Sequence, residues 1–206
     1  RQGMGLTETS PTLFLTDEEH ALSKAGSVGK PVLHTQVRIV DKHGTDVGHG
    51  QVGELWARGP NVTPGYWNRP DANEESFTDG WLHTGDAART DEDGYVYIVD
   101  RWKDMYISGG ENVYPAEVEQ VLFRHPNVLD VSVLGVPDGR WGEVGVAVIV
   151  PRDRANFIGD EILTFAAGRL ARYKLPKRVV ICDELPRNAA GKVLKRQLRE
   201  MLLSES

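Results

Sequence analysis

The residue pattern of this chain changes close to residue 102, and this change constrains the fold more than any other feature of the sequence. Before it, short runs that alternate apolar and polar residues, at 35–41, 52–59 and 95–100, are separated by clusters of Gly, Pro, Asn and Asp. A period of two is typical of half-buried strands, and DEDG at 91–94 is typical of a hairpin turn. The first half is therefore predicted to form a small antiparallel β-barrel or sheet.

Helical patterns enter only after Gly110. Pro115 suits the first position of a helix that Pro126 would end, and 128–137 and 143–151 are β-branched runs on either side of a short turn. The remaining segments are two predicted helices and a short strand, at 160–171, 191–203 and 178–186. Strands with covering helices predict an α+β module.

The length of 206 residues is enough for two small domains. The expected fold class is α+β, with a β-rich subdomain at 1–102 followed by a compact α+β domain at 103–206. Because no apolar run approaches the ~20 residues that cross a bilayer, no transmembrane segment is expected. The single Cys182 excludes a disulfide within the chain, which favours a cytoplasmic location.

The N-terminal residues RQGMGLTETSP contain neither an initiating Met nor the basic and apolar regions of a signal peptide. We therefore expect a piece of a protein that continues upstream.

The net charge is -6, and the whole acidic excess lies in the first half. Residues 1–103 hold 10 Lys and Arg against 16 Asp and Glu, whereas 104–206 hold 14 of each. Ten basic residues, which we call the basic cluster, lie between Arg169 and Arg199. They could meet a polyanion, although a solvated helix face accounts for most of them. Since no aromatic-basic pattern accompanies them, a nucleic-acid partner is not expected.

Four stretches combine small residues with polar groups more densely than folding requires. In GMGLTETS, residues 3–10, the glycines permit close backbone approach, and the Thr7 hydroxyl and Glu8 carboxylate could serve a phosphate and a divalent cation. A turn with Thr as a helix cap is the alternative. In GWLHTGD, residues 80–86, Asp86 after a Thr-Gly turn could accept hydrogen bonds from a sugar diol, or could form an Asx turn.

The other two stretches each present a cation. DRWKDMYISGGENVYP, residues 100–115, places Arg101 at a predicted strand end, as a permanently charged fork for a ribose or phosphate oxygen. ELPRNAAGKVLKRQL, residues 184–198, presents Lys192 between a flexible loop and a basic helix. There it is either a point charge for a phosphate or carboxylate, or simply exposed.

The order of these stretches resembles the adenylate-forming superfamily of acyl-CoA synthetases, peptide synthetase adenylation domains and luciferases. Five blocks at family-like spacing carry the resemblance: GMGLTETSP, VGELWARGPNVTPGYWNRP, GWLHTGD, GYVYIVDRWKDMYISGGENVYPAEVE and LPRNAAGKVLKRQLR. They cover nearly the whole chain. The resemblance implies that 1–102 is the end of the large AMP-binding domain and 103–206 the mobile C-terminal domain.

The resemblance also implies a role for each matching residue. Thr7 would contact the α-phosphate region of ATP, and Glu8 would help to hold Mg²⁺. Asp86 would bind the ribose hydroxyls, with Arg101 beside it. Lys192 would reach the acyl carboxylate and the α-phosphate, where a positive charge offsets the charge that builds between them.

Met4 and Gly5 would lie near the adenine. The family usually has an aromatic residue at the position of Met4, whose soft thioether can cover a base but gives a less fixed geometry. Nucleotide affinity is therefore expected to be weaker, or the pocket differently shaped.

The family reaction has two steps, in which a carboxylate and ATP give an acyl-adenylate, and coenzyme A then displaces AMP. Because Lys192 must be present for the first step and absent for the second, the resemblance implies that the C-terminal domain swings about Lys103. The turn of Ser108, Gly109 and Gly110 would then line the passage for coenzyme A.

The blocks look most like those of medium- or long-chain fatty acyl-CoA synthetases, and aryl-CoA ligases of the coumarate or benzoate type are the alternative. The family's phosphate loop and most of its acyl pocket would lie upstream of residue 1, so the chain alone is expected to be inactive. A nucleotide- or coenzyme A-binding module without activity is the second alternative. A homodimer of the full-length protein is also considered.

Overall fold

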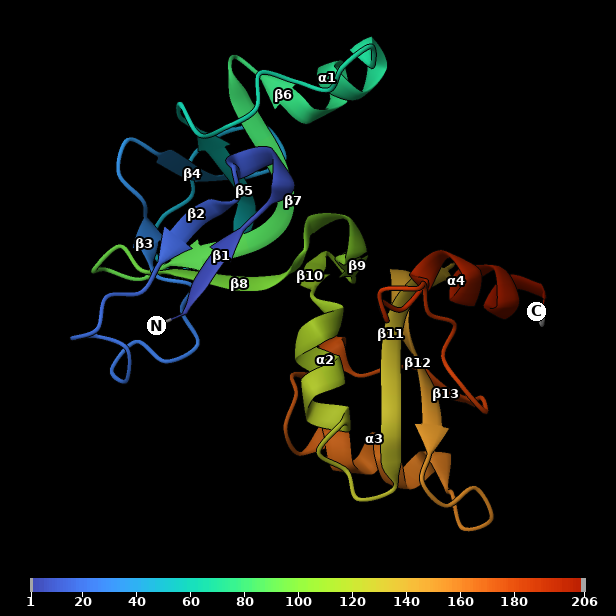
Figure 1. The fold of residues 1–206 in the computed structure, drawn as a ribbon. Coiled ribbons are helices and arrows are strands. Elements are labelled where there is room, and N and C mark those ends of the chain that lie inside the picture. The colour runs from blue at the N-terminus through green and yellow to red at the C-terminus, as the bar shows by residue number, and fades with distance from the viewer. Residues whose placement is uncertain (1, 205–206) are drawn as a thin grey trace. The chain divides into compact units, whose positions relative to one another are not determined.

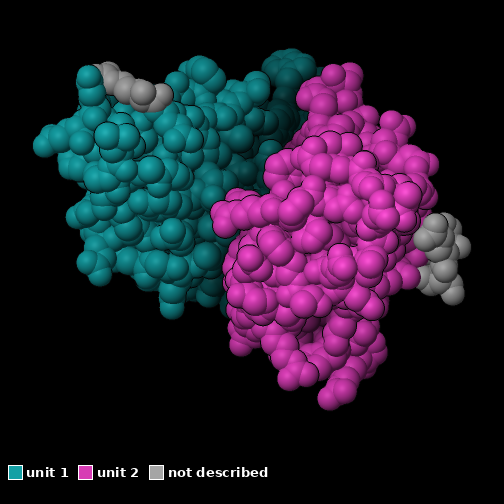
Figure 2. All heavy atoms as spheres, turned by 90° about the horizontal axis from the view of Figure 1, so that it is seen from below, with its two compact units in different colours: residues 1–103 teal, residues 104–206 magenta. Residues whose placement is uncertain are grey.

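The computed structural model describes residues 2–204. The chain forms two compact units, Arg1–Lys103 (unit 1) and Asp104–Ser206 (unit 2), drawn in teal and magenta in Figure 2. Each unit has its own buried apolar core. Within the described part of the chain, no helix is long and apolar enough to cross a bilayer.

Unit 1 is built mainly of antiparallel strands (Figure 1). A three-stranded sheet has the order β1-β2-β3, and a five-stranded sheet has the order β4-β5-β7-β6 with β8 paired to β7. The elements are β1 Gly3–Gly5, β2 Thr12–Leu15, β3 Lys30–Pro31, β4 Gln36–Val40, β5 Gly53–Arg58, α1 Pro70–Ser76, β6 Phe77–Thr78, β7 Trp81–Thr90 and β8 Val96–Arg101. Over residues 2–103 the sheets stay open, so the predicted antiparallel sheet is confirmed and the closed barrel is not formed.

The core of unit 1 is formed by apolar side chains from five of these strands. Its buried members are Leu13, Phe14, Ile39, Leu55, Ala57, Ala88 and Val96. Burying one large apolar side chain contributes about 1.5–3 kcal/mol. Trp56 points away from its neighbours Leu55 and Ala57, as alternation requires, and is covered by the ring of His83 at a centroid distance of 4.2 Å. Strand β5 is therefore buried on both faces.

The DEDG turn is formed between β7 and β8, as predicted. The Asp91 Oδ1 atom accepts the N–H of Tyr95 at 2.9 Å, and Gly94 has a φ of 80°. The turn residue chemistry therefore sets the register in which the ends of β7 and β8 meet.

Unit 2 is a mixed sheet with helices on both faces (Figure 1). The order is β10-β9-β12-β11, with β13 parallel to β12. The elements are β9 Tyr106–Ser108, β10 Glu111–Val113, α2 Pro115–Leu122, β11 Val128–Asp138, β12 Gly142–Pro151, α3 Gly159–Ala167, β13 Arg178–Ile181 and α4 Lys195–Ser204. The α+β fold class is confirmed.

The long hairpin of β11 and β12 is buried on both faces, which explains its unbroken β-branched sequence. On one face, Val131, Val133, Ala147 and Ile149 pack with Val118 of α2 and Ile162 of α3. On the other face, Leu134, Val146 and Val148 pack with Leu198 and Leu202 of α4.

Three helices of unit 2 have ends that differ from the predicted ones. Helix α3 ends at Ala167 rather than at residue 171. Helix α2 ends at Leu122 rather than just before Pro126, and the chain continues in single turns, such as the His125 N–H to Leu122 carbonyl bond at 3.0 Å. Helix α4 begins at Lys195 rather than at the start of 191–203, because a separate turn takes up the residues before it.

Candidate functional site

The stretch GMGLTETS forms strand β1 and a 3-10 helix at Thr7–Thr9. Gly5 is required by a close approach, because a Cβ there would lie 1.6 Å from the Pro11 carbonyl oxygen. The buried Thr9 holds the turn, since its Oγ1 accepts the Leu6 N–H at 3.0 Å and donates to the Pro11 carbonyl at 2.8 Å. The capping role considered for a Thr thus falls to Thr9, and Thr7 is exposed.

Glu8 is the half-buried acid of this turn, and a loop distant in sequence holds it. Its carboxylate Oε1 accepts a hydrogen bond from the Tyr66 hydroxyl at 2.9 Å, and its carbonyl oxygen accepts the Thr63 N–H at 2.8 Å. Burial, and then the bond to Glu8, raise the pKa of Tyr66, so this hydroxyl remains a donor at neutral pH.

Sequence reasoning missed Tyr66. Its place in the block VGELWARGPNVTPGYWNRP is the signal that could have found it, because that block matched the family pattern as a whole. Which residue of the block would reach the Thr7–Thr9 turn is not visible in the pattern.

Met4 lies next to this turn and packs partly against the core of unit 1. It lines an open pocket of about 260 Å³ whose other walls include Gly3, Gly5 and Leu15. A thioether at such a pocket can pack against a flat ring. The expected place of Met4 and Gly5 near an adenine stays a prediction.

A divalent cation at this turn would take Glu8 as a single protein carboxylate. Over residues 2–204, no three His, Cys, Asp or Glu side chains gather into a metal site. Such sparse ligation suits Mg²⁺, which proteins hold through one or two carboxylates while phosphates and water complete the octahedron. The residues present therefore fit Mg²⁺ bound together with a nucleotide.

Asp86 and Arg101 are partners across the β7–β8 ladder. Asp86 is 5% exposed, and its Oδ1 lies 3.0 Å from the Arg101 Nη1. Gly85 has a φ of 69°, and the β5–β7 register shifts between Glu54 and Trp56, which makes a β-bulge at this point. The Thr-Gly turn expected before Asp86 is therefore wrong, because these residues lie inside strand β7.

This pair offers a ligand both an acceptor and a donor. The Asp86 carboxylate can accept from hydroxyl groups, and the Arg101 side chain, 39% exposed, keeps part of its fork toward solvent. A buried carboxylate is costly without a cation, so Arg101 also stabilises the position of Asp86.

Lys192 stands on a hydrogen-bonded turn of unit 2. The N–H of Asn188 donates to the Lys192 carbonyl at 2.9 Å, and the Asn188 Oδ1 accepts the Lys192 N–H at 2.9 Å. Gly191 supplies a φ of 80°, and Arg187 ties the turn to Asp130 at 2.5 Å. The loop expected to be flexible is instead a bonded turn, and it presents an exposed Lys192 side chain.

Ser108, Gly109 and Gly110 belong to the hairpin turn between β9 and β10. Gly109 and Gly110 have φ values of 61° and 89°, the pair of positive angles that a two-residue type I′ turn needs. Gly109 also donates its N–H to the Trp141 carbonyl at 2.9 Å, and a Cβ there would lie 2.8 Å from the Trp141 ring. The turn itself therefore requires glycine at both positions.

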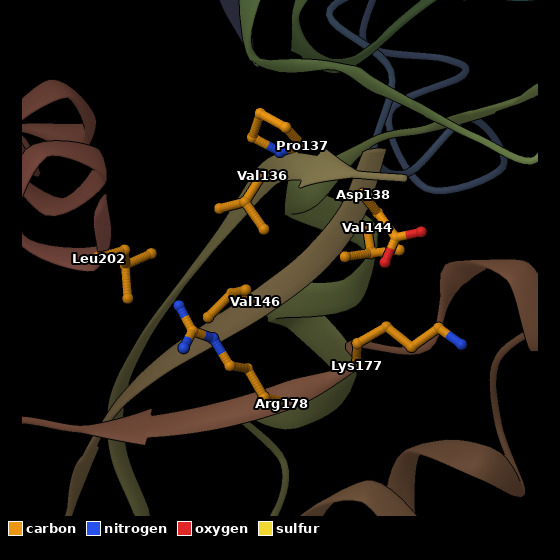
Figure 3. Close-up of a pocket in the computed structure, with 8 residues that line it drawn as sticks. All are labelled: Val136, Pro137, Asp138, Val144, Val146, Lys177, Arg178 and Leu202. Atoms are coloured by element: carbon orange, nitrogen blue, oxygen red, sulfur yellow. The ribbon is translucent and has the colours of Figure 1, made fainter. Parts of the chain in front are cut away.

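The basic cluster between Arg169 and Arg199 is partly neutralised within unit 2. Its members with a carboxylate partner include Lys174, Arg187, Lys195 and Arg196. Lys177 and Arg178 instead line a pocket of about 430 Å³ beside Leu202 (Figure 3). Only Lys195, Arg196 and Arg199 of the ten lie on an α-helix, so the predicted solvated helix face does not account for most of the cluster. The pocket brings Lys177 and Arg178 together with one acid, Asp138.

The predicted site residues divide between the two units. Those of unit 1 are Met4, Gly5, Thr7, Glu8, Asp86 and Arg101, and those of unit 2 are Ser108, Gly109, Gly110 and Lys192. Lys103, exposed in the 3-10 helix Trp102–Asp104, is the last residue of unit 1.

Two family models match this chain, "AMP-binding enzyme" at residues 1–67 and "AMP-binding enzyme C-terminal domain" at residues 117–192. Together with the fold and the five ordered blocks, they show that the chain belongs to the adenylate-forming, AMP-binding enzyme superfamily.

Similar proteins carry names of CoA ligases. The chain is 50% identical to feruloyl-CoA synthase of an Amycolatopsis species over 198 residues, which are 96% of this chain and 40% of that protein. The o-succinylbenzoate CoA synthetase of Bacillus subtilis, solved with the acyl-adenylate intermediate OSB-AMP, has a TM-score of 0.88 and 41% identity over 96% of this chain and 40% of its own. The same Bacillus protein has been solved with ATP and magnesium ion.

A fatty acyl CoA synthetase of Mycobacterium tuberculosis is 44% identical, with a TM-score of 0.62, over 99% of this chain and 40% of its own. The chain thus spans about two fifths of the length of the relatives it matches.

Proposed function

We propose that the full-length protein is an acid-thiol ligase, which activates a carboxylic acid with ATP as an acyl-adenylate and transfers the acyl group to coenzyme A. The observation that carries this proposal is the Asp86–Arg101 pair, in which an acceptor and a donor for ribose and phosphate oxygens are fixed 3.0 Å apart. The CoA ligases similar to this chain, one of them solved with ATP and magnesium ion, support it.

In the first half reaction, a carboxylate oxygen attacks the α-phosphorus of ATP and pyrophosphate leaves. Asp86 and Arg101 hold the ribose, and the exposed Thr7 hydroxyl donates to a phosphate oxygen. Glu8 would hold Mg²⁺, which when bound neutralises phosphate charge. Lys192 brings a positive charge to the carboxylate and α-phosphate oxygens as charge builds on them.

In the second half reaction, the thiol of coenzyme A attacks the acyl carbonyl and AMP leaves. Lys192 has no role in that step, and rotation about Lys103 removes it. The Gly109–Gly110 turn then borders the path of the pantetheine arm. Lys177 and Arg178, beside their pocket, offer charge for the phosphates of coenzyme A.

We propose an aryl or a fatty acid as the substrate class. The feruloyl and o-succinylbenzoate ligases favour an aryl acid, and the mycobacterial fatty acyl enzyme supports the fatty acid expected from the blocks. Pyrophosphate exchange by the full-length protein with a series of aryl acids and of fatty acids of increasing length distinguishes the two. An exchange rate that rises with alkyl length would decide against the aryl acid.

The role of Lys192 is tested by the same exchange assay on Lys192→Ala. The expected loss is about 10²–10³-fold, as for removal of one charge that stabilises a transition state. The matched control is Arg196→Ala, which removes a neighbouring cation that is 89% exposed and should leave exchange unchanged. Normal exchange by Lys192→Ala would remove this residue from the reaction.

A binding module without activity is the second candidate, because the chain spans two fifths of its relatives. Calorimetric titration of this chain with ATP and with coenzyme A tests it. The proposed ligase predicts weak or undetectable binding by this chain alone, and tight binding of either ligand would favour the module.

We also propose a homodimer and a cytoplasmic location for the full-length protein. The single cysteine supports the second. Light scattering on the eluted full-length protein would measure its mass, and a monomer at micromolar concentration would contradict the dimer.

A further inference from the structure

The segment 61–73, NVTPGYWNRPDAN, which runs into the start of helix α1, is bonded to the Thr7–Thr9 turn at three places. The Asn61 Nδ2 donates to the Thr9 carbonyl at 3.2 Å. The Thr63 N–H donates to the Glu8 carbonyl at 2.8 Å, and the Tyr66 hydroxyl donates to the Glu8 Oε1 at 2.9 Å. The last two bonds hold both the backbone and the side chain of the same acid.

Contacts with helix α1 and with Phe77 hold Tyr66 in place. The side-chain amide of Asn73, on helix α1, accepts the Tyr66 N–H at 2.6 Å and donates to the Tyr66 carbonyl at 3.1 Å. The Tyr66 ring meets the edge of Phe77 at a centroid distance of 6.5 Å. A Cβ on Gly65 would lie 3.0 Å from the Asn73 Oδ1, so a glycine there lets the Asn73 amide approach the Tyr66 backbone. The phenol is therefore pre-organised rather than free to rotate away.

The bond from Tyr66 leaves Glu8 with one engaged oxygen. Within residues 2–204, Oε1 has this hydrogen bond, and no hydrogen bond or ion pair is found to Oε2. A carboxylate fixed through one oxygen points the other in a defined direction. Orientation matters for Mg²⁺, which demands a near-ideal octahedron and is sensitive to groups that orient its ligands.

We propose that Tyr66 is a positioning residue that orients the Glu8 carboxylate toward the divalent cation bound with ATP. The inference rests on the proposed function, which assigns Glu8 to that cation. It adds a second layer to the site, in which a tyrosine 58 residues away along the chain sets how well the cation and nucleotide bind.

The test measures cation binding directly on full-length Tyr66→Phe. Mn²⁺ serves as the probe in place of Mg²⁺, because it takes the same oxygen ligands, and its binding in the presence of a non-hydrolysable ATP analogue is followed by electron paramagnetic resonance. Loss of a hydrogen bond to a charged group is expected to weaken Mn²⁺ binding about tenfold. The Mg²⁺ concentration for half-maximal pyrophosphate exchange should rise by the same factor, with a smaller change in kcat.

Two further variants control the interpretation. Tyr97→Phe removes another tyrosine-to-carboxylate bond of unit 1, to Asp91 at 3.3 Å, and should leave the Mn²⁺ affinity unchanged. Tyr66→Phe in a Glu8→Gln background should add little to the effect of Glu8→Gln alone, because the two residues act through one carboxylate.

Each outcome decides the inference. An unchanged Mn²⁺ affinity of Tyr66→Phe, or a loss that Tyr97→Phe shares, overturns it. A fall in melting temperature and kcat with an unchanged cation requirement also overturns it, since it would show a structural role only. The wild type could bind Mn²⁺ and the analogue but exchange no pyrophosphate. That result would refute the proposed ligase activity but not the role of Tyr66, which weaker Mn²⁺ binding by Tyr66→Phe would still support. If Tyr66→Phe does not fold, Asn73→Ala is the alternative variant. It keeps the phenol of Tyr66 but removes the two hydrogen bonds to the Tyr66 backbone, and it should also weaken Mn²⁺ binding.

Discussion

Asp86 and Lys192 both serve the proposed reaction, yet the two units hold them in opposite ways. Asp86 lies inside a strand, 5% exposed and bonded to Arg101. Lys192 is exposed, and the bonds that fix it are made by its backbone, to Asn188. One unit fixes the functional side chain itself, and the other fixes only the turn that carries it.

This difference fits what each group has to do in the proposal. A nucleotide-binding pair keeps its geometry through both half reactions, which favours burial in a sheet. A lysine that serves one half reaction has to reach its target and then leave, which favours a rigid turn carrying a free side chain. Four predictions, from the largest expected effect to the smallest, test this contrast.

The largest effect is expected from breaking the Asp86–Arg101 pair, in which the carboxylate is buried and the Arg101 side chain is half-buried. Arg101→Ala leaves the Asp86 carboxylate buried without its arginine and should cost about 3 kcal/mol in local stability. Hydrogen exchange of peptides from β7 and β8 in the full-length protein measures this loss. The control, Arg196→Ala, removes an exposed pair with Glu200 and should change its own peptide by less than about 1 kcal/mol. Equal protection in wild type and Arg101→Ala would mean that the pair does not hold the strand ends together.

The next effect concerns the turn of unit 2. Gly109→Ala meets both a positive φ and the Trp141 ring, so about 2 kcal/mol of destabilisation is expected, whereas Gly110→Ala has a positive φ but open space and should cost about 1 kcal/mol. Thermal unfolding of the two variants compares them. Equal melting temperatures of the two variants would mean that the clash with the Trp141 ring does not affect stability.

A third substitution separates the half reactions. Lys103→Pro fixes a backbone angle at the end of unit 1 and should slow thioester formation about tenfold more than adenylation, a difference of about 1.4 kcal/mol in activation free energy. The two rates are measured apart, with Lys103→Ala as the control that keeps the backbone free. A parallel fall in both rates would contradict the hinge.

The smallest effect is a pH dependence confined to unit 1. The hydrogen bond from the Tyr95 hydroxyl at 2.5 Å, helped by His20, holds the pKa of the Asp17 carboxyl well below its usual range. Because the folded-state pKa is lower than the unfolded value of about 3.9, this contribution is complete above that pH and is lost as the pH falls below it. Tyr95→Phe should therefore reduce the acid dependence of unfolding between about pH 2 and 4. Tyr173→Phe, in unit 2, is the matched control, and acid curves that coincide for wild type and Tyr95→Phe would refute the assignment.

Local pattern was sufficient for most elements. Residues 128–137 and 143–151 form the two longest strands of unit 2, because β-branched residues that pack on both faces favour an extended backbone. The Gly109–Gly110 pair makes a hairpin turn for a reason that is equally local, the need for two positive φ angles. Alternation likewise predicted β4, β5 and β8 of unit 1, though not the other strands of that unit or whether the sheets would close.

Contacts distant in sequence account for what the pattern missed. The bulge at Gly85 depends on how β7 pairs with β5, so Asp86 was expected after a turn. Helix α4 starts late because Asn188 bonds to Lys192 in a turn that competes with the helix. Tyr66 meets Glu8 across 58 residues, and a propensity of either residue says nothing about that meeting.

By itself, the sequence determined strands β4, β5, β8, β11, β12 and β13, helices α2, α3 and α4, the family and the choice of candidate site residues, since all of these depend on residue type, order and short-range spacing. Only the tertiary structure decided that Asp86 is buried against Arg101, that Lys192 is carried on a bonded turn, and that Tyr66 supports Glu8. Those outcomes depend on strand register and on side chains that folding brings together, and neither is written in any short stretch of the chain.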